Sequence, residues 1–147
     1  MRGLAEKEGV IERELRKKPS RKFQKAETHF WTLAQKELPI PLGEFDTVRY
    51  SFLKVYPVTG RRHQIRRHLS YEHHPIVGDK KHGHSSHNRL WKEDLNLPGL
   101  MLQAYRISFT HPINQENVKL EAEVAPHIQH AMAYLGWSLN QKSPLNE

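Results

Sequence analysis

Residues 60–83 read GRRHQIRRHLSYEHHPIVGDKKHG, and they combine a helical pattern with a high density of positive charge. Residues 61–68 alone contain four arginines and two histidines. Ile65 and Leu69 are four positions apart, which is the spacing of an apolar stripe on one side of a helix. The pattern predicts a helix over about 63–71 that packs this stripe against the core of the protein.

The arginines of this helix are expected to be of two kinds. Arg62 and Arg66 lie one turn apart on a stripe beside the apolar one, so one of them can be shielded while the other stays in solvent. A partly buried arginine needs an acidic partner, because an unpaired buried charge is costly. Gly60 is expected to let the chain turn closely before the helix, whose first amides favour anions. A plainer alternative, a surface helix with scattered arginines, stays open on the pattern alone.

The whole chain is basic and contains no cysteine. Its 147 residues carry a formal net charge of +7, and segment 12–25 (ERELRKKPSRKFQK) holds seven Lys and Arg against two Glu. Clustered basic charge is typical of proteins that bind a polyanion, most often nucleic acid. Segment 12–25 is then either a grip on phosphates or a mobile tail. Without cysteine, disulfides and zinc thiolate sites are excluded, and no apolar run approaches the roughly 20 residues of a membrane span. We therefore expect a cytoplasmic protein with no membrane partner.

Outward from the helix, the sequence predicts an α+β domain with a mostly antiparallel sheet and a few helices. Pro126 and Gly136 are placed to begin and end a last helix. In the strand predicted over 47–56, alternation puts Tyr50 and Phe52 on one face and Leu53 on the other. The other expected strands are 26–34, 100–110 and 118–124, with loops over 36–46 and 74–99 and helical or irregular structure over 1–25.

Two spaced motifs in this region resemble the C-terminal signature of the RluA-type pseudouridine synthases, which reads approximately G-R-x-H-Q-[IL]-R-x-H-L followed by G-H-P-I-x-G-D. The flanking segments FDTVRYSFLKVYPVTG, KHGHSSHNRLW and LPGLMLQAYRISFTHPI are similar to the tRNA pseudouridine synthase C branch of this family. The resemblance covers about residues 26–137, and Gln103 departs from it where relatives carry His. The matching residues are Gly60, Arg61, His63, Gln64, Ile65, Arg66, His68, Leu69, His74, Pro75, Ile76, Gly78 and Asp79.

The resemblance implies an enzyme that isomerises uridine to pseudouridine in the T-stem of tRNA, without cofactor or metal. In the family an aspartate acts as nucleophile while the N-glycosidic bond breaks, and the target base must leave its stack. The arginine of H-Q-[IL]-R, here Arg66, pairs with that aspartate and keeps it ionised. The residues implied to contact RNA are Arg61, Arg62, His63, Gln64, Arg67, Lys80 and Lys81. Those implied to hold the motif together are Gly60, His68, Leu69, His74, Pro75, Gly78 and Asp79.

The family's nucleophile lies in an upstream H-R-L-D-x-x-T-S-G motif that this sequence does not contain. The only aspartates are Asp46, Asp79 and Asp94, and Asp79 matches a loop position with a hydrogen-bonding role. We therefore divide the chain into a basic N-terminal segment, 1–25, and a C-terminal part of a synthase catalytic domain, 26–147. This chain alone is expected not to make pseudouridine, and the missing N-terminal half is an expected partner besides tRNA.

Other interpretations are kept as alternatives. A noncatalytic RNA-binding remnant of a synthase fits the same residues. An unrelated DNA-binding module fits less well, because no helix-turn-helix or zinc pattern is present. His82, His84 and His87 form either a metal site or a polar loop facing RNA, and the second is favoured because no second ligand cluster has a recognisable spacing.

Overall fold

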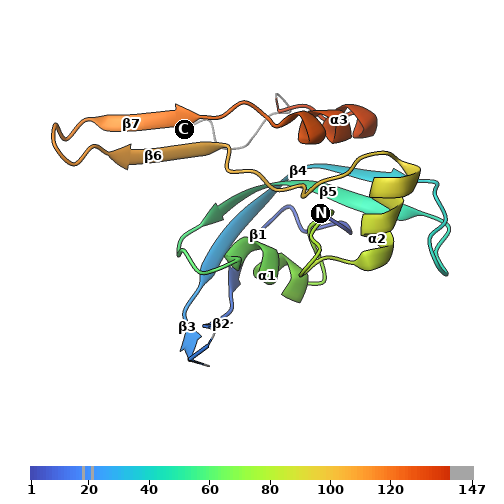
Figure 1. Cartoon of the computed structure of the whole chain (residues 1–147), viewed down its shortest axis with the longest axis horizontal. Coiled ribbons are helices and arrows are strands. Elements are labelled where there is room, and N and C mark those ends of the chain that lie inside the picture. The colour runs from blue at the N-terminus through green and yellow to red at the C-terminus, as the bar shows by residue number, and fades with distance from the viewer. Residues whose placement is uncertain (18, 21, 140–147) are drawn as a thin grey trace.

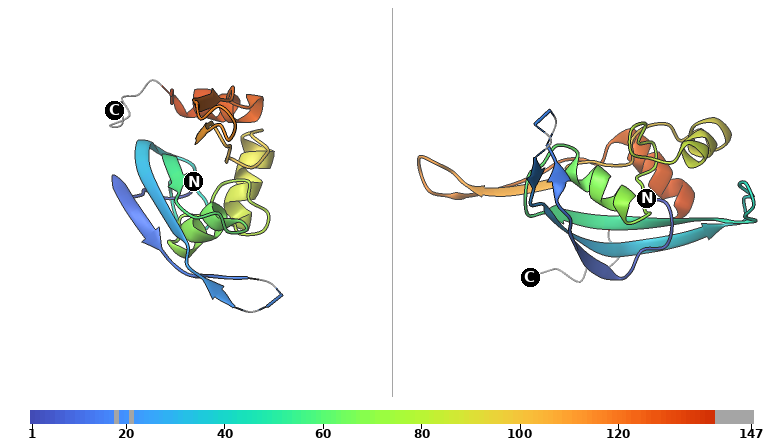
Figure 2. Two further views of the ribbon diagram at one scale, coloured as in Figure 1. Left: turned by 90° about the vertical axis from the view of Figure 1, so that its left-hand side faces the viewer. Right: turned by 90° about the horizontal axis from the view of Figure 1, so that it is seen from below.

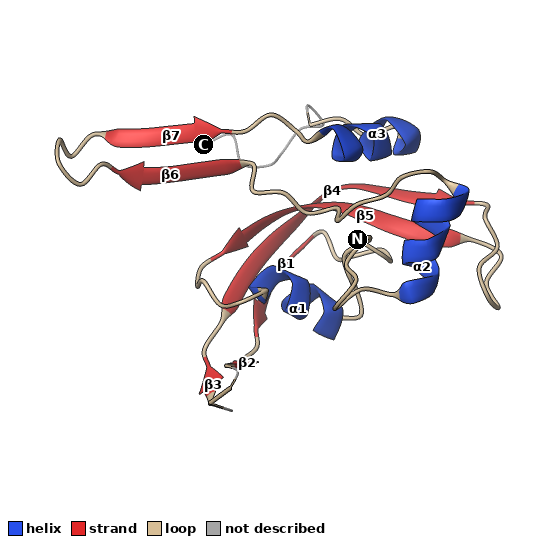
Figure 3. Cartoon of the chain, viewed as in Figure 1, coloured by secondary structure: helices blue, strands red, loops and turns tan. Residues whose placement is uncertain are grey.

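The computed structural model describes residues 1–17, 19–20 and 22–139 of the chain. Figures 1 and 3 show an α+β fold in which a three-stranded antiparallel sheet is accompanied by two hairpins and short helices, as the sequence predicts. The elements in chain order are β1 (Glu8–Glu12), β2 (Leu15–Arg16), β3 (Phe23–Gln24), β4 (Glu27–Leu38), β5 (Val48–Pro57), α1 (Gln64–Tyr71), α2 (Ser85–Arg89), the π-type turn η1 (Leu90–Asp94), β6 (Arg106–Thr110), β7 (Asn117–Glu121) and α3 (Pro126–Leu135).

The central sheet has the order β1-β4-β5, and both pairings are antiparallel. A register shift between Thr32 and Ala34 interrupts the ladder of β4 with β5, an irregularity of the kind that bends and twists a strand. β4 extends to Leu38, beyond the predicted end at residue 34. It stops there because Pro39 has no N–H to contribute to the ladder.

The N-terminal segment was expected to be helical or irregular, and its described residues contain three strands, β1, β2 and β3, with irregular structure between them. β1 pairs with β4, with Ile11 opposite Thr28, and β2 pairs with β3 to form a short finger that projects from the sheet (Figure 1). Ile11 is 5% exposed, whereas its neighbour Val10 is 54% exposed, so one face of β1 packs on the protein. Pairing with β4 is a long-range contact that local composition does not report. β1 is therefore an integral strand of the central sheet.

Two apolar clusters hold the helices against the sheet. The smaller one packs Leu69 of α1 and Ile76 against Ile11 of β1, with Leu53 of β5 beside them. Burying Leu69 contributes about 2 kcal/mol. The larger cluster joins the end of β4 and the start of β5 to η1 and α3. Its buried residues are Leu38, Val48, Tyr50, Val77, Leu90, Trp91, Leu97, Ala131 and Leu135.

The alternation predicted for β5 is confirmed. Leu53 contributes to the smaller cluster, whereas Tyr50 belongs to the larger one. The ring of Phe52, which alternates with Leu53, stacks on Trp137 with centroids 5.7 Å apart. β5 therefore serves both clusters, one on each face.

The segment 74–99 contains two consecutive helical turns, α2 and η1, where the sequence predicts mostly loop. Leu90 and Trp91 are each 4% exposed, and the Trp91 ring meets Tyr50 edge-on with centroids 5.1 Å apart. The glycines and prolines that suggested a loop lie outside 85–94, so the composition of the whole segment masked these turns.

The C-terminal part consists of the hairpin β6–β7 and helix α3. The strand predicted from residue 100 begins only at Arg106, because the chain first crosses the core, where the Met101 N–H donates to the Val77 carbonyl oxygen at 2.9 Å. The right-hand view of Figure 2 shows the hairpin projecting beyond the sheet. Pro126 begins α3 and Gly136 ends it with a left-handed φ of 70°, as predicted. Among the described residues, no helix has the length and apolar character needed to cross a membrane.

Candidate nucleic-acid interface around helix α1

Gln64, the first residue of α1, fastens the start of the helix to β4. Its Nε2 donates to the Glu27 carbonyl oxygen at 2.8 Å and to the Thr28 hydroxyl at 2.9 Å. Its Oε1 accepts from the Thr59 hydroxyl at 2.6 Å and from the Arg61 backbone N–H at 3.1 Å. The side chain is 4% exposed, and its polar atoms are all used inside the protein. Contrary to the expectation, Gln64 is an internal anchor and does not face RNA.

His68 continues this network one turn later and is fully buried. Its Nδ1 accepts from the Thr28 hydroxyl at 2.9 Å, and its Nε2–H donates to the Arg13 carbonyl oxygen at 2.9 Å. These contacts require the neutral tautomer with the proton on Nε2. Burial lowers the pKa of His68, which favours this neutral form. The residue thus ties α1 both to β4 and to the chain that follows β1.

Arg66 has the dedicated acidic partner that the helical pattern predicts, and within this chain the partner is Asp79. Arg66 Nε donates to Asp79 Oδ2 and Nη2 donates to Oδ1, both at 2.7 Å. The carboxylate is 0% exposed and the Arg66 side chain 21%. A bidentate pair of this kind is short, strong and geometrically specific. Within the described chain Arg66 thus has Asp79 as its partner, and the expected pairing with an aspartate from outside the chain stays a prediction.

Asp79 also organises the loop that follows it. Its Oδ1 accepts the backbone N–H groups of Lys81 and His82, each at 2.9 Å. Burial by itself would raise the pKa of Asp79, but the hydrogen bonds from Arg66 and from the two N–H groups hold that pKa well below its usual range. The carboxyl group is therefore ionised at neutral pH, and both of its oxygens are occupied.

Asn88 of α2 closes the other side of this loop. Its Nδ2 donates to the Asp79 carbonyl oxygen at 2.9 Å, and its Oδ1 accepts the Gly78 N–H at 2.8 Å. Gly78 has a φ of +78°, and a Cβ on it would lie 1.7 Å from the carbonyl oxygen of Gly99. The glycine of the G-D pair is thus required both by its backbone angle and by the close passage of another chain segment.

The sequence suggested that Gly60 makes the turn into α1. In the structure the turn is made at His63. His63 has a left-handed φ of 53°, whereas a Cβ on Gly60 would meet nothing within 4 Å. His63 Nδ1 lies 3.1 Å from His82 Nε2, a hydrogen bond that joins the helix start to the Asp79 loop. Burial lowers the pKa of both imidazoles. Lys80 and Lys81 are exposed on the outside of this loop.

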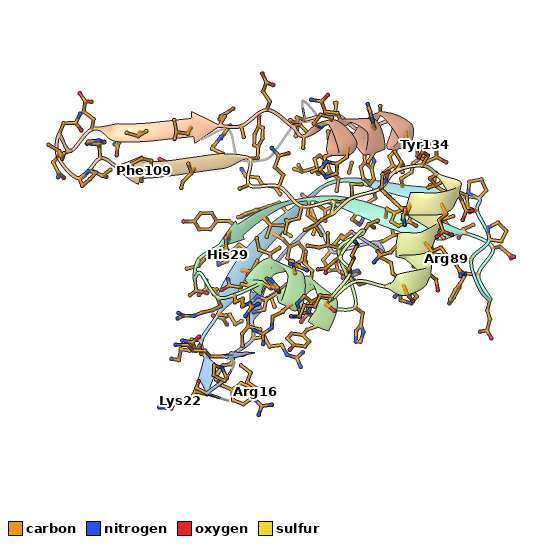
Figure 4. The ribbon with its side chains drawn as sticks, in the orientation of Figure 1. Arg16, Lys22, His29, Arg89, Phe109 and Tyr134 are labelled. Carbon is orange, nitrogen blue, oxygen red and sulfur yellow. The ribbon has the colours of Figure 1, made fainter. Side chains whose placement is uncertain are left out.

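Arg61, just before α1, and Arg67, within α1, lie beside the β2–β3 finger. Arg61 Nε donates to the Lys25 carbonyl oxygen at 3.1 Å, and Arg67 Nη1 donates to the Arg16 carbonyl oxygen at 3.3 Å. Figure 4 shows Arg16 and Lys22 extending from the finger. The start of α1 and the finger thus bring segments far apart in the sequence together. We call the group formed by Arg16, Lys22, Lys25, Arg61, Arg62 and Arg67 the basic surface.

The motif residues His74 and Pro75 connect the segment after α1 to the N-terminus of the chain. The Pro75 carbonyl oxygen accepts the Arg2 N–H at 3.0 Å, and His74 Nδ1 lies 3.1 Å from the Arg2 carbonyl oxygen. The motifs do not point to Thr28 and Asn88, because the roles of these two residues depend on long-range contacts. A sequence signal exists only for Asn88, a side chain that can bond backbone groups in a loop rich in glycine.

The three histidines of segment 82–87 do not converge. His82 pairs with His63, whereas His87 Nδ1 lies 2.9 Å from the Tyr50 hydroxyl. Burial lowers the pKa of His87 to about 4 and raises that of Tyr50 to about 12. Across the described residues, no three side chains of the metal-binding types gather at one point.

Comparison with known proteins gives one consistent result. Residues 3–71 match the family described as RNA pseudouridylate synthase. The tRNA pseudouridine synthase C of Pectobacterium carotovorum subsp. carotovorum is 40% identical over 119 residues, which are 81% of this chain and 32% of that protein. The protein of the same name from Vibrio cholerae is 41% identical over 120 residues, 82% of this chain and 49% of that protein.

A solved structure shares the fold. Human RNA Pseudouridylate Synthase Domain Containing 1 matches with a TM-score of 0.58 and 24% identity over 86% of this chain and 53% of that chain. The chain thus spans about half or less of the length of these relatives. The segment matched by the family includes α1 with its anchors, and the relatives' identity extends over most of the remaining chain. On these grounds the chain is similar, over most of its length, to proteins of the RNA pseudouridylate synthase family.

Proposed function

We propose that this chain is the tRNA-binding part of a synthase that converts uridine to pseudouridine in the T-stem of tRNA. Similarity to the family supports the reaction class, and the names of the relatives support tRNA as the substrate. The observation that carries the proposal is the placement of the basic surface directly beside the Arg66–Asp79 pair.

The basic surface suits a phosphate backbone because the inward-facing polar residues of α1 bond the sheet, whereas the arginines face outward. Gln64 and His68 are turned inward and are satisfied by β4. Arg61 and Arg67 each donate one guanidinium N–H to a backbone carbonyl oxygen in or next to the finger. Their other N–H groups can donate to another acceptor. Arg62 is exposed. Guanidinium groups bind phosphate oxygens strongly and in a defined geometry.

Among the described residues, the one aspartate paired with an arginine is Asp79, and Asp79 is not free to act as a nucleophile on ribose. Asp79 is fully buried, and its oxygens are held by Arg66 and by two backbone N–H groups. Releasing an oxygen for attack would also leave the Arg66 charge without its partner, at a high cost. Asp46 lies exposed between β4 and β5, and Asp94 lies exposed at the end of η1. The chain by itself is therefore inactive, and the nucleophilic carboxylate comes from the part of a synthase that lies outside it.

Arg66 is placed to serve that incoming carboxylate. Its Nε and Nη2 are committed to Asp79, which leaves the Nη1 N–H groups for a second acceptor. A guanidinium at this position favours the ionised form of the carboxylate. In the reaction the bond between N1 of uracil and C1′ of ribose breaks and a bond between C5 and C1′ forms. The proton on C5 is removed and N1 takes up a proton, so the product is an isomer of the substrate.

A binding and a turnover measurement test the proposal separately. In a gel-shift titration the chain should bind tRNA with an affinity that falls with salt. Arg62→Ala should weaken this binding, whereas Arg89→Ala, on an exposed arginine of α2, should not. With tRNA labelled with tritium at C5 of uridine, the chain alone should release no tritium.

Addition of the part of the V. cholerae relative outside its matched residues should restore release, with the new pseudouridine mapped to the T-stem. Tritium release by the chain alone would contradict the assigned inactivity. Absence of tRNA binding at low salt would contradict the proposed function as a whole. Binding without release in the complemented mixture would favour the alternative, a noncatalytic RNA-binding remnant.

A further inference from the structure

The hairpin β6–β7 presents an apolar face to solvent. Ile107 lies opposite Leu120 and Phe109 lies opposite Val118, so these four side chains share one face. Ile107, Phe109 and Leu120 are 58%, 41% and 54% exposed. The other face is polar and carries Arg106, Ser108, Thr110, Asn117, Lys119 and Glu121.

A hairpin of this kind is incomplete by itself. β6 and β7 form a separate two-stranded sheet, so each strand has one edge that pairs with no other described strand. Figures 1 and 2 show the hairpin projecting from the body, and Figure 4 places Phe109 on this projection. Isolated two-stranded hairpins are marginally stable in water, and contiguous exposed apolar patches mark interaction sites. The hairpin therefore has the properties of a surface that another polypeptide covers.

The apolar face leads into a groove between the hairpin and α3. This groove has a volume of about 870 Å³, and Tyr105, Val124, Met132 and Trp137 are among the residues that line it. Tyr105 directly precedes β6, and its hydroxyl donates to Glu121 Oε2 of β7 at 3.3 Å, so the groove begins at the end of the hairpin nearer α3. We call the two together the hairpin surface, defined by Tyr105, Ile107, Phe109, Val118, Leu120 and Met132.

We propose that the hairpin surface is the docking site for the part of the pseudouridine synthase fold that this chain lacks. This inference rests on the proposed function. The matched residues make up 49% of the V. cholerae relative and 53% of the human structure, so each of these proteins carries about as much polypeptide again. A strand of that part pairs with an open edge of the hairpin, and its apolar side chains cover Ile107, Phe109 and Leu120.

A second copy of the chain fits this surface less well. The chain has a net charge of +7, so two copies repel one another, and the repulsion grows at low salt. The complementary part of a synthase has no such constraint, and it is also the part that must bring a carboxylate to Arg66. One docking event thus covers the hairpin and completes the site.

The test uses a pair of double variants on one strand. Ile107→Glu with Phe109→Glu places two charges on the apolar face. The control, Ser108→Glu with Thr110→Glu, places the same two charges at the neighbouring positions on the polar face. The probe is the part of the V. cholerae relative outside its 120 matched residues, co-expressed with the full chain carrying an affinity tag. Circular dichroism confirms that both variants fold.

The parent chain and the polar-face control should purify with the probe as a one-to-one complex. The apolar-face variant should bind at least about tenfold more weakly, as loss of a central apolar anchor does in other interfaces. Equal binding by both variants, or no complex with a soluble probe, would overturn the proposal. So would a homodimer in light scattering that the apolar-face variant dissociates, because the occupant would then be a second copy.

A linked form of the experiment removes any dependence on the solubility of the separate probe. With the probe fused ahead of Met1, hydrogen exchange of the amides in 106–121 should be slower than in the chain alone, and unchanged exchange would refute the docking. tRNA binding by the chain alone reports on the proposed function separately. Loss of docking with intact tRNA binding rejects only this inference. Docking without tRNA binding rejects only the proposed function.

Discussion

Replacing Arg66 by Met tests whether the Arg66–Asp79 pair holds the loop beside α1. Methionine keeps most of the side-chain length and removes the guanidinium, so two hydrogen bonds of 2.7 Å disappear. The Asp79 carboxylate, which is 0% exposed, stays buried with only two backbone N–H donors. Breaking a buried pair by removing one partner costs about 3–5 kcal/mol. The lower end applies here, because those N–H groups still compensate part of the charge.

A loss of about 3 kcal/mol corresponds to a decrease in Tm of about 6–12 °C for a chain of this size. The effect must depend on pH. In the parent chain the folded pKa of Asp79 is depressed, so its contribution is present above the unfolded pKa of about 4 and is lost as pH falls below it. In the variant, burial without the guanidinium raises that pKa instead. The difference in Tm between parent and variant should therefore be largest near pH 7 and shrink as the pH approaches 4.

Thermal unfolding followed by circular dichroism at several pH values measures the decrease in Tm and its dependence on pH. Arg62→Met, on the exposed arginine one turn earlier, is the matched control and should leave Tm nearly unchanged. Arg66→Met with Asp79→Asn removes both charges, and it should recover part of the loss because no buried charge is then unpaired. A decrease in Tm of less than about 2 °C that does not vary with pH would show that the pair does not hold the loop.

Three further predictions follow from the same geometry. Gly78→Ala should prevent stable folding, since its Cβ would lie 1.7 Å from a backbone oxygen. Gly60→Ala should leave Tm within a few degrees, because its Cβ would meet nothing within 4 Å. Equal effects of the two changes on Tm would contradict the turn assignment. The free energy of unfolding should fall as pH decreases from 6.5 to about 4, because the unfolded state takes up a proton that buried His87 resists. His87→Asn should reduce the dependence of the unfolding free energy on pH. If denaturant titrations of the variant show the same dependence on pH as the parent, other groups cause it. Arg62→Ala and Arg67→Ala should each reduce the slope of log K for tRNA against log salt by about 1, and an unaltered slope would remove that arginine from the phosphate contacts.

The sequence predicted those parts of the fold whose signals are local. The periodicity of Ile65 and Leu69 located α1 to within one residue of its start, and the alternation of Tyr50 and Leu53 assigned the two faces of β5. Pro126 marked the start of α3. The demand for an acidic partner beside the apolar stripe also followed from local spacing and from the cost of an unpaired buried charge.

What the sequence did not predict depends on contacts between distant segments. β1 is a strand because it pairs with β4, so the charged composition of residues 1–25 gave no indication of it. Gln64 was expected at the RNA surface because it stands in a charged motif, but its amide fits between β4 and Thr59. The identity of the Arg66 partner was missed for a related reason. Thirteen residues separate it from Asp79, and the distance closes only through the loop after α1.

The Arg66–Asp79 pair explains how a site can be prepared before its nucleophile is present. A lone arginine facing an empty position would be free to move, and ordering it when a carboxylate arrives would oppose binding. Asp79 instead fixes two N–H directions of the guanidinium, and the Lys81 and His82 amides in turn fix Asp79. The remaining side of Arg66 is then held in one orientation at no further cost in conformational entropy. In the proposed function, Asp79 thus positions Arg66, and Arg66 positions a second carboxylate from outside the chain.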